Sequence, residues 1–137
     1  MIKITKETSV SIDDVLHLYQ AVGWTNYTNQ PQMLSQALSH SLATYLARDG
    51  EEIVGLVRLV GDGFSSVFVQ DLIVLPSYQR QGIGSNLMKE ALADYKDAYQ
   101  IQLATEQTEK TLGFYRSLGF ETLSTYDCTG MIWVDRK

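Results

Sequence analysis

The sequence of 137 residues has little cysteine and no long apolar run. Because Cys128 is the one cysteine, no disulfide can form within the chain, which fits a reducing compartment. The longest run of large aliphatic residues is 72–75, whereas a membrane span needs about 18 apolar residues. Residues 1–7 lack the apolar core of a signal peptide. These absences predict a soluble, cytoplasmic protein that does not bind a membrane.

Positive charge is also scarce. Lysine and arginine number 11 against 16 aspartates and glutamates, which gives a formal net charge of −5. Proteins that bind nucleic acid usually carry a basic face, so this balance argues against a nucleic-acid partner. An acidic chain suits a cationic substrate such as an amine.

Hydrophobic residues make up 45% of the chain, which is enough for the core of one domain. Alternating or β-branched runs predict strands at 2–5, 44–48, 53–60, 66–75, 101–104, 120–126 and 130–134. Apolar residues at helical spacing predict helices at 12–22, 31–41, 82–95 and 108–118, and residues 24–30 predict a loop. The order β-αα-βββ-αβ-αββ predicts one mixed α/β (α+β) domain over residues 1–137. Its central sheet would have six or seven strands flanked by about four helices.

The most informative stretch is the passage from strand 66–75, through Pro76, into the helix that starts at Gly82. The first N–H groups of a helix have no internal partners and lie at the positive end of its dipole, so they suit a phosphate. Gly82 and Gly84 let an anion approach the backbone, and Arg80 adds a charged donor. An ordinary strand-to-helix turn is the alternative reading of this motif by itself.

Two other nucleotide motifs are absent from this stretch. A P-loop requires Gly-Lys-Ser/Thr, and a dinucleotide fingerprint requires a third glycine where Leu87 stands.

Two segments resemble signatures of the GCN5-related N-acetyltransferase (GNAT) superfamily. Residues 79–84, Gln-Arg-Gln-Gly-Ile-Gly, match the pattern Arg/Gln-x-x-Gly-x-Gly/Ala at every fixed position, and residues 114–120 resemble the second signature. The two lie about 30 residues apart, and a paired signature is far more specific than one motif. The predicted order of elements is similar to that family over essentially the whole chain.

The resemblance implies that acetyl-CoA is the co-substrate and that no metal is needed. It implies that the fourth and fifth strands splay apart around the pantetheine arm and that the amine attacks the thioester directly in a ternary complex. The cofactor-binding residues that it implies are Leu72, Ile73, Val74, Gln79, Arg80, Gln81, Gly82, Ile83, Gly84 and Ser85.

The resemblance also implies a catalytic role for Tyr115, as the acid that protonates the leaving thiolate. A phenol with a pKa near 10 is close enough in acidity to an alkyl thiol for this transfer. Packing of the helix is the alternative role for Tyr115. The family often has an asparagine seven residues before this tyrosine, where this chain has Thr108.

Asp71 is the best-placed candidate for the base that removes a proton from the amine. A carboxylate in a mostly apolar strand is costly unless it is paired or functional, so pairing with a polar neighbour is the alternative. Trp24 and Tyr27 are candidate substrate-binding residues, since aromatic rings can hold an amine by cation–π contact. The alternative is that Trp24 and Tyr27 are core anchors whose rings hold the loop in place.

The leading hypothesis is an N-acetyltransferase acting on a small-molecule or peptide amine. A non-catalytic acyl-CoA-binding or regulatory module is the alternative, and a structural α/β partner protein is a third. No His/Cys/Asp cluster has the spacing of metal ligands. The late strands present an edge through which two copies could pair, so a homodimer is a further hypothesis.

Overall fold

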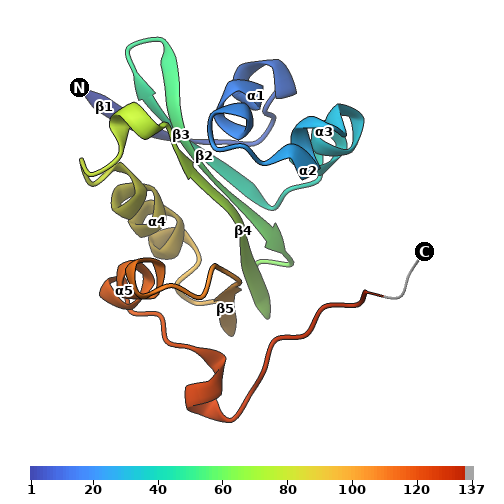
Figure 1. The fold of residues 1–137 in the computed structure, drawn as a ribbon, viewed down its shortest axis with the longest axis vertical. Coiled ribbons are helices and arrows are strands. Elements are labelled where there is room, and N and C mark those ends of the chain that lie inside the picture. The colour runs from blue at the N-terminus through green and yellow to red at the C-terminus, as the bar shows by residue number, and fades with distance from the viewer. Residues whose placement is uncertain (135–137) are drawn as a thin grey trace. The chain divides into compact units, whose positions relative to one another are not determined.

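Five strands form one mixed sheet in the first of two compact units, Met1–Leu103, of this computed structural model (Figure 1). The structure describes residues 1–134. The strands lie in chain order: β1 (Ile2–Glu7), β2 (Ala43–Asp49), β3 (Glu52–Gly61), β4 (Ser66–Val74) and β5 (Gln100–Leu103). The first four pair antiparallel and β5 pairs parallel to β4. The predicted mixed α+β architecture is confirmed.

Helices cover both faces of this sheet (Figure 1). The first three helices, α1 (Ile12–Ala21), α2 (Thr25–Thr28) and α3 (Pro31–Ser39), share one hydrophobic cluster with the sheet. Helix α4 (Ile83–Asp94) packs on the opposite face. A Cβ on Gly55 would lie 3.2 Å from Leu87 Cδ1 and 3.4 Å from Ala47 Cβ, so glycine at this position lets α4 approach the sheet closely.

β4 contains a β-bulge, which lies shortly before the end of the strand. Arg58 pairs with Asp71 and Leu59 with Val69, so Gln70 is an extra residue in β4. Bulges bend a strand and often lie beside functional sites. β4 pairs with β5 only over Ser66–Val69, and beyond this point the described chain gives β4 no strand on that side.

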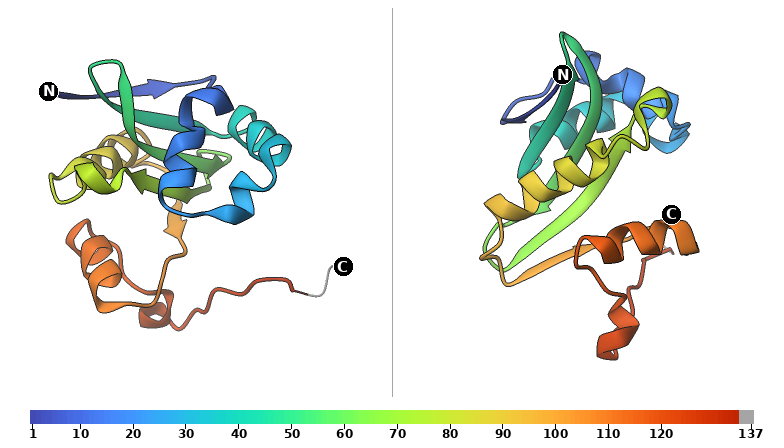
Figure 2. Two further views of the ribbon diagram at one scale, coloured as in Figure 1. Left: turned by 45° about the horizontal axis from the view of Figure 1, so that its top comes forward. Right: turned by 90° about the vertical axis from the view of Figure 1, so that its left-hand side faces the viewer.

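The second unit begins at Ala104 and contains α5 (Glu109–Ser117) and the 3-10 helix η2 (Leu123–Tyr126). The chain that follows η2 runs extended, without a helix or strand up to residue 134 (Figure 2). No described residue of this unit is buried. The prediction that residues 1–137 form one domain stays a prediction.

Three predicted features of the fold are wrong. Residues 120–126 do not form a strand, because Thr125 N–H and Asp127 N–H donate to Thr122 and Ser124 and close the turns of η2. Residues 130–134 also form no strand, so the described sheet has five strands rather than six or seven.

The third wrong feature is the loop over residues 24–30, which contains α2. Thr28 N–H donates to Trp24 O at 3.1 Å and Asn29 N–H donates to Thr25 O at 2.9 Å, which makes one helical turn. The side chain of Tyr27 fixes this turn to the sheet, and that long-range contact has no local sequence signal.

Candidate functional site

The end of β4 has one free edge in the described chain. Leu72, Ile73 and Val74 pair with β3 on one side and have no strand partner on the side of β5. Ile73 is buried, whereas Leu72 and Val74 are half-buried. Backbone groups on such an edge are available to a ligand that hydrogen-bonds like an added strand.

The turn after β4 carries unusual backbone conformations. After Leu75 the chain makes the 3-10 helix η1 (Pro76–Tyr78) and then reaches Arg80, whose φ is +66°, and Gly82, whose φ is +80°. A left-handed conformation costs a residue with a side chain roughly 1–2 kcal/mol, and strain of this kind collects at functional sites. Arg80 therefore holds a conformation that its local sequence does not favour.

Helix α4 begins directly after this turn, and no side chain caps it. Its first N–H groups have no partners within the helix. A Cβ added to Gly82 would meet no atom of the chain within 4 Å, so the space over the helix start is open. In the first turn of α4, Ile83 is buried, and Gly84 and Ser85 are half-buried. Residues 79–82, which precede the helix, are exposed.

Two side chains fix the turn to the sheet, and sequence reasoning missed both contacts. Gln79 Nε2 donates to Val74 O at 3.1 Å, and the Tyr78 hydroxyl donates to Asp49 Oδ2 at 2.7 Å. The hydrogen bond to Asp49 raises the pKa of Tyr78 to about 12. The same bond lowers the pKa of Asp49 below its usual value. Tyr78 and Asp49 lie too far apart in sequence for their contact to be predicted. The contact between Gln79 and Val74 involves residue types that are too common to indicate it.

Asp71 lies at the centre of a buried polar network. Its carboxylate accepts hydrogen bonds from Tyr19 (2.9 Å), Tyr27 (2.9 Å) and Arg58 Nε (2.8 Å). Only 4% of Arg58 and 3% of Asp71 are exposed, so the ion pair is shielded from water. Arg58 also donates to Ser41 Oγ and, from Nη2, to the Tyr27 hydroxyl, both at 3.2 Å. Asp71 is therefore paired with polar neighbours, which is the alternative that the sequence offered to a catalytic base.

The pKa values of the three groups around Asp71 are all raised. Burial, together with the charge of Asp71, raises the pKa of Tyr19 and of Tyr27. Burial opposes the charge on Arg58, but the charge of Asp71 and its hydrogen bond outweigh that effect and raise the pKa of Arg58. Both phenols stay neutral and the guanidinium stays charged at neutral pH.

Trp24 and Tyr27 meet in an aromatic cluster with Tyr19. The ring of Tyr27 lies 5.0 Å from that of Tyr19 and 6.3 Å from that of Trp24. Tyr27 is 8% exposed and Trp24 is half-buried at the N-terminus of α2. Tyr27 is thus an anchor of the core, and Trp24 presents the more accessible ring of the two. Their predicted substrate-binding role stays a prediction.

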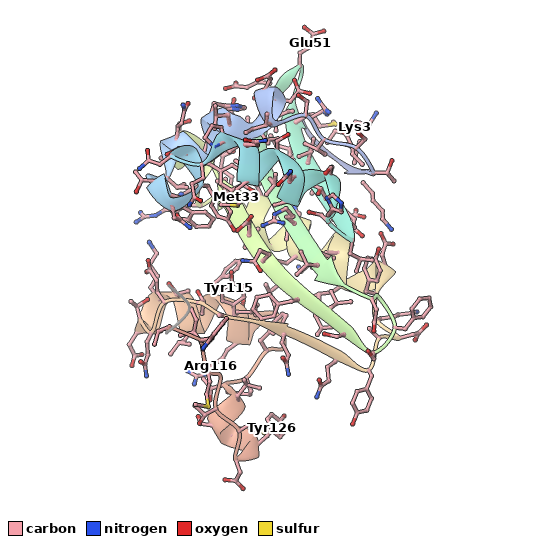
Figure 3. All side chains as sticks on the ribbon, turned by 90° about the vertical axis from the view of Figure 1, so that its right-hand side faces the viewer. Lys3, Met33, Glu51, Tyr115, Arg116 and Tyr126 are labelled. Atoms are coloured by element: carbon pink, nitrogen blue, oxygen red, sulfur yellow. The ribbon has the colours of Figure 1, made fainter. Side chains whose placement is uncertain are left out.

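Tyr115 lies on α5 in the second unit (Figure 3). Its ring makes edge contacts with Phe114 at 5.0 Å and with Phe120 at 5.9 Å. Burial raises the pKa of Tyr115, which keeps the phenol protonated at neutral pH. A protonated phenol is the form that a general acid requires.

Thr108, the position where the sequence departs from the family pattern, caps α5. Its hydroxyl oxygen accepts a hydrogen bond from Thr111 N–H at 3.2 Å. This contact satisfies one of the free donors at the start of the helix.

Neither a metal cluster nor a membrane span is present in the described chain. Residues 1–134 contain no group of three or more metal-ligating side chains. Within the same residues, every helix is too short or too polar to cross a bilayer.

Comparison with known proteins assigns the family. Residues 40–122 match the model of the acetyltransferase (GNAT) domain, which covers more than half of the chain. The chain therefore belongs to the GNAT acetyltransferase family.

Individual relatives agree with this assignment. A GNAT-family acetyltransferase of Streptococcus pneumoniae is 74% identical, with a TM-score of 0.93 and full coverage of both chains. Serotonin N-acetyltransferase 2 of rice (Oryza sativa) is 29% identical over 82% of this chain, which spans 58% of the rice protein. The aminoglycoside N-acetyltransferase AAC(6')-Iy, whose structure contains CoA, is 16% identical with a TM-score of 0.72, and it covers 100% of this chain and 95% of its own. At that identity the likeness concerns the fold alone.

Proposed function

We propose that this protein transfers an acetyl group from acetyl-CoA to a primary amine of a small molecule, by direct attack in a ternary complex. The observation that carries the proposal is the uncapped start of α4, where left-handed Arg80 and Gly82 open the helix N-terminus. Family membership supplies the reaction class. A cytoplasmic location stays a prediction from the sequence.

The residues at the end of β4 and the start of α4 fit acetyl-CoA. The open space at Gly82 and the free N–H groups of the first turn of α4 suit the pyrophosphate. Arg80 is exposed and able to add charge there. The unpaired edge of Leu72–Val74 suits the amides of the pantetheine arm. When bound, acetyl-CoA supplies the activated acetyl group.

Asp71 acts through its neighbours in this proposal. Its carboxylate is occupied by two phenols and a guanidinium, and those contacts fix Tyr27 and the α2 turn. We assign it a positioning role on the acceptor side, where Trp24 would meet the amine. The alternative is that the Asp71 carboxylate is the base that accepts a proton from the amine. Asp71→Asn separates these roles: loss of a positioning role raises the KM for the amine more than it lowers kcat, whereas loss of a base lowers kcat most.

Tyr115 is the proposed acid that protonates the thiolate of CoA. Tyr115→Phe removes the phenolic hydroxyl that would donate the proton and keeps the ring contacts with Phe114 and Phe120. We expect kcat to fall by about 100-fold or more, with the affinity for acetyl-CoA unchanged. Because burial raises the pKa of Tyr115, the wild-type rate should show no loss from its ionisation below about pH 10. The matched control is Tyr126→Phe, which changes an exposed tyrosine and should leave kcat unaltered.

Titration calorimetry with acetyl-CoA tests the proposed cofactor site. We expect binding to wild-type protein, and weaker binding to Arg80→Ala by at least about 10-fold because a charged hydrogen bond is worth about 1.5–3 kcal/mol. Absence of binding at millimolar acetyl-CoA would contradict the proposal.

A non-catalytic acyl-CoA-binding module is the second candidate function. It is favoured by the complete engagement of Asp71, since the best-placed carboxylate already has its partners. This candidate predicts the same binding of acetyl-CoA but no acetylation of any amine.

A further inference from the structure

The bulge in β4 places two successive side chains on the same face of the sheet. In a regular strand, neighbouring side chains point to opposite faces. Gln70 and Asp71 form the bulge instead, and both contact the hydroxyl of Tyr27, which belongs to α2. Both side chains therefore lie on the face that α1, α2 and α3 cover.

Gln70 is also the first residue of β4 beyond its pairing with β5, which ends at Val69. It lies two residues before the free edge at Leu72–Val74, or about 7 Å along an extended strand. The proposed pyrophosphate site follows Val74 in the chain, so an arm that pairs along this edge has its acetyl end toward Gln70. Since Gln70 is exposed, its side chain is open to a ligand there.

The Tyr27 hydroxyl fixes the orientation of the Gln70 amide. A phenol has one proton to donate, and Tyr27 donates it to Asp71 Oδ1 at 2.9 Å. Toward Gln70 the hydroxyl oxygen can therefore only accept a hydrogen bond. The donor Nε2 faces it across a long contact of 3.5 Å, and the acceptor Oε1 faces away. No hydrogen bond within the first unit occupies Oε1.

We propose that Gln70 Oε1 accepts a hydrogen bond from the amine of the acceptor substrate and so determines which amines are positioned for attack. This inference rests on the proposed function. The neighbouring carboxylate of Asp71 is already engaged by two phenols and a guanidinium, whereas Oε1 is open. A neutral primary amine has two N–H groups and one lone pair. One N–H donates to Oε1 while the lone pair faces the acetyl carbonyl, and the amide takes no proton.

Steady-state kinetics of Gln70→Met gives the first test. Methionine keeps the length of the side chain and removes the amide. The KM for serotonin, spermidine or kanamycin, whichever the wild type acetylates, should rise by about 10-fold. The value of kcat should fall less, and the affinity for acetyl-CoA should stay unchanged. The matched control is Gln100→Met, which alters an exposed glutamine of β5 opposite Ser66 and should leave the KM unaltered.

Gln70→Glu shows which end of the amide matters. The carboxylate keeps an acceptor oxygen but removes the Nε2 donor to Tyr27. The proposal predicts a KM for the amine close to the wild-type value, because the acceptor is retained. If Gln70 served only to support Tyr27, the KM would rise as much as in Gln70→Met, and that result overturns the proposal.

Titration calorimetry separates failure of this inference from failure of the proposed function. The same three amines are titrated into CoA-saturated wild-type protein and Gln70→Met. Weaker binding of an amine to the variant supports the role of Gln70, even if no amine is acetylated. Acetylation by the wild type with an unchanged KM in Gln70→Met overturns the inference and leaves the proposed function standing. Absence of both amine binding and acetylation in the wild type overturns the two together.

Discussion

At the scale of single residues, the backbone conformation of Gly82 and the buried charges of Arg58 and Asp71 are the most informative features. Gly82 has a positive φ and faces open space, so its conformation and its lack of a side chain matter separately. Arg58 and Asp71 form an ion pair that has almost no contact with water. Each feature gives a prediction in which a matched variant separates the alternatives.

Gly82→Ala should reduce both stability and cofactor affinity. The left-handed φ costs alanine about 1–2 kcal/mol, and the new methyl group would project into the space assigned to the pyrophosphate. Gly50→Ala is the matched control, since Gly50 also has a positive φ and open space but lies in the β2–β3 turn. Urea unfolding should show a similar loss for both variants, while calorimetry should show weaker acetyl-CoA binding for Gly82→Ala alone. Equal affinities would argue against the pyrophosphate site.

Arg58 and Asp71 should be strongly coupled in stability. Asp71→Asn leaves the guanidinium of Arg58 buried without its counter-charge, which should cost about 3–5 kcal/mol in the free energy of unfolding. The double variant Arg58→Met with Asp71→Leu removes both charges and should recover much of that loss. Denaturant unfolding of Arg58→Met, of Asp71→Leu and of the double variant measures the coupling. Additive losses would mean that the two side chains act independently.

At the scale of elements, the parts that could be predicted from sequence are those with local signals. The helices α1, α3, α4 and α5 and the strands β1–β5 all lie within the predicted segments or close to their ends. Periodicity and the residues Pro31, Gly82 and Gly119 define these elements locally. The turn at residues 79–84 was recognised because its glycines and following helix are also local.

The elements that could not be predicted depend on distant contacts. α2 is held by Tyr27 against Asp71, 44 residues away, and no periodicity records that contact. Residues 130–134 have strand composition, but composition does not state whether a neighbouring strand exists to pair with. Likewise Asp71 was recognised as an unusual carboxylate, whereas its partners Tyr19 and Arg58 were missed.

Helix α5 should depend on its Thr108 cap. Thr108→Ala removes the acceptor for Thr111 N–H and should destabilise the helix by about 1 kcal/mol. Thr108→Asn restores the residue found in many family members and is an equally good cap, so it should leave the helix intact. Amide hydrogen exchange at Thr111 and Leu112 measures the effect. Unchanged exchange in Thr108→Ala would show that the cap does not contribute.

At the scale of the whole molecule, burial is unevenly distributed between the two units. The strands β2 and β3 contain long runs of buried residues, whereas residues 104–134 contain none. Local opening is easiest where few apolar contacts are buried. In dilute protein, amides of α5 should therefore exchange with solvent faster than those of β3. Exchange in α5 as slow as in β3 would contradict this expectation.

Acetylation of a panel of amines is the most direct measurement of the central claim. Release of the CoA thiol would be followed with acetyl-CoA and serotonin (because the rice relative is a serotonin N-acetyltransferase), polyamines, aminoglycosides, amino acids and peptide N-termini. The proposed function predicts amine-dependent thiol release with at least one small cationic amine, and a rate at least 100-fold lower for Tyr115→Phe. Binding of acetyl-CoA without thiol release from any amine would contradict the enzyme and favour the binding module.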